Sequence, residues 1–171
     1  MGHTVVLGFD NESVAIIHNL LEPFGANKIP FGRVCNREQA DKIMDYHMTL
    51  HHWPKTMDSY CLPKLRGFQS IPCQVLVDGI GILPSKENSW LLYFEVNPTA
   101  TFTQLKLLFE RHTGFSVTRF YHITVAVEKD YNRIIEIHDY ICKNQTFPFI
   151  LTADRIDLYK IWSPTQKIMS I

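Results

Sequence analysis

The sequence predicts a single α+β domain built mainly from antiparallel sheets. Strand patterns and helix patterns alternate along the 171 residues. One pair of strand patterns, around residues 73–96, is separated by only a short polar loop, as in an antiparallel hairpin. Apolar residues make up 46% of the chain and run through its whole length, with no low-complexity stretch or linker between them. We therefore expect one domain over residues 1–171, large enough to bury its own core.

The first part of the chain alternates strand and helix. Residues 4–10 form a β-branched, apolar run typical of a strand, and residues 11–13 offer capping side chains for a helix. Pro23 and Gly25 end that helix. The next expected elements are a short helix over 36–41, a strand over 46–53 and a loop region with one irregular turn over 54–72.

The second part begins with the hairpin. The strand over 73–83 contains Gly79 and Gly81, which favour a bulge or a close backbone contact; a phosphate-binding loop is the weaker interpretation, because an isolated Gly-x-Gly is not specific. The remaining expected elements are a loop over 84–88, a return strand over 90–96, a helix over 101–112 ended by Gly114, a strand over 120–128, a helix over 130–143 and a strand over 147–162.

The charge balance and the cysteines narrow the function. Lys and Arg number 17, and Asp and Glu also number 17. The chain therefore lacks the excess of basic residues that a protein needs to bind a long nucleic-acid tract. None of the four cysteines forms a Cys-x-x-Cys pair, so a zinc ribbon is not supported. We expect no signal peptide before the first strand, and no apolar run is long enough to cross a membrane. We expect a monomeric cytoplasmic protein with reduced thiols that binds a small nucleotide or a short oligonucleotide.

An internal repeat is the most specific feature of the sequence. Residues 46–50 read Tyr-His-Met-Thr-Leu and residues 121–125 read Tyr-His-Ile-Thr-Val. Each copy follows a helix pattern and has strand character. The repeat predicts a duplicated half-domain with one motif per half.

The spacing of the repeat puts its polar residues together. Residues i and i+2 of a strand point to the same face, so His47 and Thr49 project together, as do His122 and Thr124. If the halves are related by a pseudo-twofold axis, the four side chains face one another across one groove. One imidazole can then accept a proton and the other can donate one, near neutral pH. The two hydroxyls can bind the non-bridging oxygens of a phosphate.

At these residues the sequence resembles the 2H (two-histidine) phosphoesterase superfamily, also called LigT-like or 2′-5′ RNA ligase-like. The resemblance includes both His-x-Thr motifs, the hairpin around 74–96, the helix over 101–112 and the closing strand with Arg155-Ile-Asp-Leu-Tyr159. It implies a bilobal α+β fold, two pseudo-symmetric lobes of mainly antiparallel sheet with outer helices around a central groove. It also implies a phosphodiesterase for 2′,3′-cyclic phosphates, 2′-5′ linked or cyclic oligonucleotides. Tyr121 stands where many members have proline.

Four further residues are candidates for the rim of the groove. Trp53 and Tyr159 have rings that could stack a nucleobase. Arg155 could reach a phosphate, and we expect His51 near the groove rim. For each of these four, ordinary packing or a solvated charge is the competing interpretation.

Two other functions remain open. A nucleotide-binding module of the same fold would bind without turnover, although a pure binder needs no acid–base pair. A metal-dependent hydrolase would use His47, His51 and His52, with His47 and His51 on one face of the strand. A metal site needs a third ligand and supporting partners, and no acidic partner is evident, so we expect neither a metal nor a cofactor.

Overall fold

The computed structural model describes residues 2–25, 46–85, 88–161 and 166–171. Its main elements are β1 (Gly2–Phe9), α1 (Asn11–Leu21), β2 (His47–Pro54), α2 (Asp58–Cys61), β3 (Cys73–Ser85), β4 (Ser89–Pro98), α3 (Ala100–Thr113), β5 (His122–Glu128), α4 (Tyr131–Asn144), β6 (Phe149–Ile161) and β7 (Gln166–Ser170). The predicted α+β class is confirmed. The short helix expected over 36–41 lies outside the described residues.

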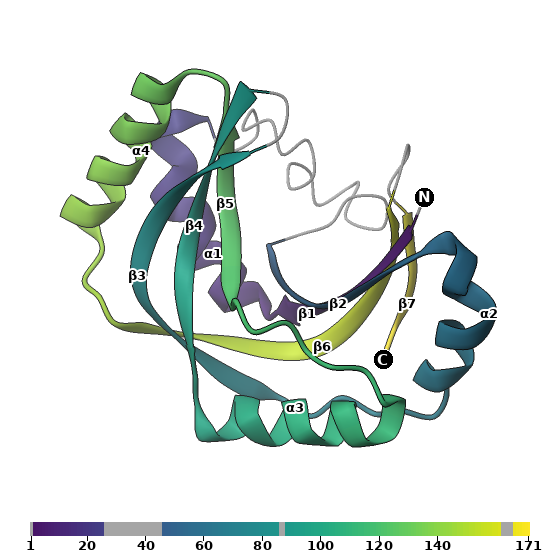
Figure 1. Ribbon diagram of the computed structural model, residues 1–171. Helices are drawn as coiled ribbons and strands as arrows, with labels where there is room; N and C mark the ends of the chain where they lie inside the picture. The colour runs from purple at the N-terminus through teal and green to yellow at the C-terminus, as the bar shows by residue number, and fades with distance from the viewer. Residues whose placement is uncertain (1, 26–45, 86–87, 162–165) are drawn as a thin grey trace.

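The seven strands form one bent sheet in the order β1-β2-β5-β4-β3-β6-β7, and all their pairings are antiparallel. The long strand β6 also pairs with β1, so the strand order returns to its start. Two lobes result: β1, β2 and β7 belong to one, β3, β4 and β5 form the other, and β6 pairs with strands of both (Figure 1).

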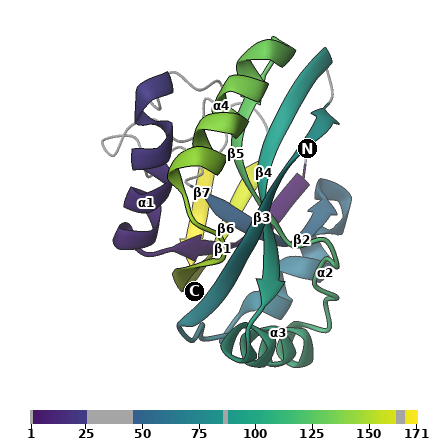
Figure 2. The same ribbon diagram turned by 90° about the vertical axis from the view of Figure 1, so that its left-hand side faces the viewer.

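Helices cover the outer side of this sheet. Figure 2 shows α1 and α4 side by side, while α3 lies at the other end of the molecule. The helix α4 turns Ile134, Ile137 and Ile141 inward, each 0% exposed, as the helical spacing of these residues predicts. Within the described ranges, no helix is long and apolar enough to cross a membrane.

Local signals set the ends of the helices. Asp10, not residues 11–13, caps α1, because its side chain accepts a hydrogen bond from the Ser13 backbone nitrogen at 2.8 Å. Thr99 caps α3 in the same way through the backbone nitrogen of Phe102. Gly114 ends α3 with φ 69°, a left-handed conformation that favours glycine.

Three segments differ from the sequence-based expectations. The region expected to be a loop with one irregular turn holds three short helical segments: Lys55–Met57, α2 and Leu62–Leu65. The strand expected from residue 120 begins at His122. The strand β7 was not expected; it adds to β6 at the edge of the first lobe.

Candidate active site

The two His-x-Thr segments meet where the lobes join. The strands β2 and β5 share one antiparallel pair, Met48 with Ile123. Both side chains are 0% exposed and lie in the core, so the residues on either side of them point to the opposite face of the sheet. This register places the flanking residues in two opposed pairs: His47 with Thr124, and Thr49 with His122.

The neighbouring strands extend these pairs into two rows across the sheet. The first row is Arg155, Gly8, His47, Thr124, Tyr93 and Gly81. The second row is Asp157, Val6, Thr49, His122, Glu95 and Gly79. The four motif side chains are partly exposed, so they share one accessible face, as the spacing predicts. Their catalytic roles remain predictions.

A β-bulge follows the threonine in each motif. Leu50 is the extra residue between Thr49 and His51 in β2, and Val125 is the extra residue after Thr124 in β5. Both extra residues are buried. An internal duplication would leave bulges at matching positions in this way, and the duplication itself remains a prediction.

The bulge at Leu50 reverses the faces of the histidines that follow it. His51 pairs with the buried Val5 and therefore lies on the core side of the sheet. His52, which pairs with Thr4, takes the face that carries His47. The expectation that His47 and His51 share a face is therefore wrong.

His51 is held in place on the core side. Its ring stacks on Phe115 with a centroid distance of 4.4 Å, and its Nδ1 lies 3.1 Å from the Ser116 carbonyl oxygen. Burial lowers the pKa of His51, and the contact with Ser116 offsets part of this shift. In the part of the chain that the structure describes, no three His, Cys, Asp or Glu side chains cluster as metal ligands would.

The two candidate stacking residues are buried. Trp53 is 1% exposed, its ring stacks on His3, and its Nε1 donates to Asp58 at 2.9 Å. Tyr159 is 3% exposed and packs beside Val6. Neither ring offers an open face to a base, so burial corrects this expectation for both.

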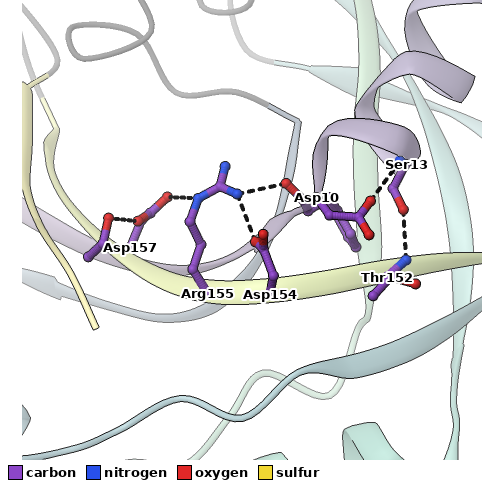
Figure 3. A network of polar contacts seen from close by, with 8 residues as sticks. Asp10, Ser13, Thr152, Asp154, Arg155 and Asp157 are labelled. Atoms are coloured by element: carbon purple, nitrogen blue, oxygen red, sulfur yellow. Dashed lines mark hydrogen bonds and ion pairs between the residues drawn. The ribbon is translucent and has the colours of Figure 1, made fainter.

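The register places Arg155 on the same face as the motifs, and Figure 3 shows its guanidinium group between Asp154 and Asp157. Its Nε donates to Asp157 at 3.0 Å, and its Nη1 donates to Asp154 at 2.8 Å and to the Phe9 carbonyl at 2.7 Å. Burial would lower the pKa of Arg155, but the two carboxylates raise it above its usual value.

A glycine lets Arg155 lie flat on the sheet. A Cβ atom on Gly8 would be 2.9 Å from Nε and 3.0 Å from Cζ of Arg155, so the side chain crosses this glycine. Gly8 pairs with Arg155 on one side and with His47 on the other. The guanidinium group is therefore directed from β6 towards the strand that carries His47.

The surroundings of His122 fix its tautomer. Its Nδ1 lies 3.2 Å from the Phe120 carbonyl oxygen; because a carbonyl only accepts, Nδ1 carries the hydrogen and Nε2 is left for a ligand. The ring also stacks on Phe120 at 4.7 Å and meets Tyr93 edge to face at 5.9 Å.

Sequence reasoning did not identify the residues packed beside His122. A Cβ on Gly81 would lie 2.5 Å from the Tyr93 hydroxyl, and one on Gly79 would lie 2.8 Å from a Glu95 carboxylate oxygen. These glycines therefore make room for two large side chains on the motif face. The alternation of Gly79 and Gly81 was the available signal. It predicted a bulge or a close backbone contact, and the register of β3 with β4 does shift between Val77 and Gly79, but the sequence did not identify the contacting side chains.

The comparisons with known proteins give the fold. No family model matches the chain, and no curated protein matches it. Among solved structures, LigT of E. coli complexed with 3′-AMP is 10% identical with a TM-score of 0.53, over 99% of this chain and 95% of that one. Usb1 of Kluyveromyces marxianus is 10% identical with a TM-score of 0.54, over 97% and 96% of the two chains. TT0787 of Thermus thermophilus is 14% identical with a TM-score of 0.53, over 100% and 97%.

These similarities extend over nearly the whole length of each chain. At 10–14% identity they speak for the fold alone. The chain has the two-lobed α+β fold of LigT.

Proposed function

We propose that the protein is a phosphodiesterase of the 2H superfamily that cleaves a nucleotide phosphodiester without a metal. The observation that carries this proposal is the single pairing of Met48 with Ile123, which brings both His-x-Thr motifs onto one accessible face. Two imidazoles and two hydroxyls on one face match the needs of phosphoryl transfer: a base, an acid and donors for the phosphate oxygens.

The mechanism assigns one proton transfer to each histidine. One imidazole takes a proton from the attacking water or ribose hydroxyl, and the other gives a proton to the leaving oxygen. His122 is suited to either task at Nε2, because the Phe120 carbonyl holds its Nδ1–H. Thr49 and Thr124 donate hydrogen bonds to the non-bridging oxygens, where negative charge grows in the transition state.

The substrate class is a small nucleotide phosphodiester: a 2′,3′-cyclic phosphate, a 2′-5′ linked oligonucleotide or a cyclic oligonucleotide. LigT, which shares the fold, has been solved with 3′-AMP, ATP, NADP⁺ and phosphate. The equal numbers of basic and acidic residues agree with a short ligand.

A turnover assay with chelator present tests the proposal. Purified protein is incubated with 2′,3′-cyclic nucleotides, 2′-5′ oligoadenylates and cyclic oligonucleotides, and the products are identified by mass. His47→Ala and His122→Ala remove one imidazole each, and His138→Ala, on α4, is the matched control. We expect turnover in chelator to fall roughly 100- to 10,000-fold in the first two variants and to persist in the control.

Two results would contradict the proposal. Activity that disappears with chelator would point to a metal-dependent hydrolase. Nucleotide binding without turnover of any substrate would point to a binding module of the same fold.

A further inference from the structure

A depression lies beside His122 and shares Glu95 with the second row of the candidate active site. It has a volume of about 400 Å³, enough for a nucleobase and part of its sugar. It is lined by Asp78, Glu95, Val96, Asn97, Pro98, Arg119, Phe120 and Tyr121. Two of these residues touch the motif: Phe120 stacks on the His122 ring, and Glu95 is the cross-strand partner of His122. A ligand in this depression would therefore extend directly from a phosphate bound at His122.

The exposed ring of Phe120 is the main feature of the depression. Phe120 is 48% exposed, yet its position is fixed. It stacks on His122 with an interplanar angle of 27° and meets Tyr93 edge to face at 5.5 Å. An aromatic ring that is held by its neighbours and open to solvent provides a stacking surface for a base.

The polar side chains of the depression determine which hydrogen-bonding groups of a nucleobase can bind there. Glu95 and Asp78 bring carboxylates, Arg119 brings a guanidinium group, and Asn97 donates its side-chain amide to Asp78. Carboxylates accept hydrogen bonds. They match a base that presents N–H groups, and guanine presents two adjacent N–H donors on one edge.

We propose that this depression is the subsite for the nucleobase next to the scissile phosphate. The base stacks on Phe120 and turns its N–H edge towards Glu95, so guanine is preferred over uracil. The inference rests on the proposed function, because it takes the phosphate to lie at His122.

Equilibrium binding tests the subsite separately from turnover. Guanosine 3′-monophosphate, uridine 3′-monophosphate and inorganic phosphate are titrated into the protein by calorimetry. The variants are Phe120→Leu, Phe120→Trp and Glu95→Gln, and the control is Tyr60→Leu, which alters an aromatic side chain that is 60% exposed on α2.

We expect Phe120→Leu to weaken binding of guanosine monophosphate roughly 5- to 150-fold, the range of one base–aromatic stack. The affinity for inorganic phosphate should stay unchanged in Phe120→Leu. The Phe120→Trp variant should bind guanosine monophosphate with the affinity of the native protein. Glu95→Gln should narrow the preference for guanosine over uridine monophosphate. The Tyr60→Leu control should bind all three probes as the native protein does. In turnover, the Phe120→Leu effect should fall on KM more than on kcat.

The outcomes separate the subsite from the function. Nucleotide binding that depends on Phe120, without turnover of any substrate, would leave the subsite standing and overturn the phosphodiesterase. If the protein turns over a substrate but Phe120→Leu changes its nucleotide affinities by less than twofold, the phosphodiesterase would stand and the subsite would be overturned. If Phe120→Leu weakened the affinity for nucleotide and for inorganic phosphate equally, Phe120 would act only through His122, and the subsite would be overturned. A native protein that binds neither nucleotide would also overturn the subsite.

Discussion

At the scale of single residues, the two threonines differ from the other hydroxyls of the sheet by their position. Thr49 and Thr124 are partly exposed and lie opposite the histidines of the other strand. Thr4, on the same face, is buried and donates to the His51 carbonyl. Of these three threonines, only Thr49 and Thr124 are therefore placed to meet a phosphate.

Replacing either threonine should reduce the rate of turnover. In Thr49→Val or Thr124→Val the shape is kept and one donor is lost, so we expect kcat to fall roughly 100- to 1,000-fold. Serine at the same position should restore most of the activity, and Thr146→Val, outside the sheet, should have no effect. Steady-state kinetics with unchanged circular dichroism would check this. A rise in KM alone would mean that the hydroxyls bind substrate and transition state equally.

Gly8 should be sensitive to the smallest added side chain. A Cβ there would approach Arg155 to 2.9 Å, so Gly8→Ala forces the guanidinium away from its partners. We expect a loss of unfolding free energy of about 1–3 kcal/mol, the usual cost of overpacking. Urea denaturation measures it.

A double-mutant cycle gives this prediction its control. With the Arg155 side chain removed, in Arg155→Ala, the added methyl group has no guanidinium to meet, and the cost of Gly8→Ala should fall. The same cost in both backgrounds would show that the close approach does not limit this position.

At the scale of elements, the strand period explains both what the sequence predicts and where it fails. The two motif strands and the shared face of His47 with Thr49 follow from alternation at i and i+2. The reversal at His51 does not, because Leu50 is one extra residue, and an apolar residue in a strand carries no mark of a bulge.

The residues beside His122 were missed for a related reason. Glu95 and Tyr93 reach the motifs through the register between β4 and β5, and register is a property of two strands that neither sequence shows alone. Phe120 was expected inside the strand, whereas its carbonyl folds back to accept from His122. Trp53 and Tyr159 were candidates because they are aromatic, and only the packing of the elements reveals that they are buried.

The contact between β2 and the segment before β5 should make stability depend on pH. The pKa of His51 is lowered mainly by burial, so the folded protein favours the neutral ring. In the pH range from its ordinary value of about 6.5 down to the lowered value, the unfolded chain binds more protons, and stability falls as pH falls. Thermal unfolding between pH 7.5 and 5 should show this decrease.

His51→Phe provides the comparison for this prediction. Phenylalanine keeps the stacking on Phe115 and cannot be protonated. The melting temperature of the variant should fall less over the same pH range, since the other histidines are common to both proteins. Parallel curves would mean that His51 does not contribute to the pH dependence.

At the scale of the whole molecule, β6 connects the two lobes. Its residues 149–153 pair with β3, and its residues 153–161 pair with β1. The lobes also meet at Met48 and Ile123. Because β6 belongs to the sheet of both lobes, unfolding of either lobe would remove strand partners and apolar cover from the other. We therefore expect the protein to unfold in a single cooperative transition.

Two tryptophans can report on the lobes separately. Trp53 is buried in β2 of the first lobe, and Trp90 contacts Tyr131 at 4.6 Å in the second. In variants that keep only Trp53 or only Trp90 of the chain's three tryptophans, the denaturant midpoint from fluorescence should coincide with the midpoint from far-ultraviolet circular dichroism. Each comparison is made within one variant, so a difference in stability between the variants does not affect it. If the Trp53 signal changed before the circular dichroism while the Trp90 signal changed after it, the lobes would be separate folding units. The candidate active site between them would then be lost before the second lobe unfolds.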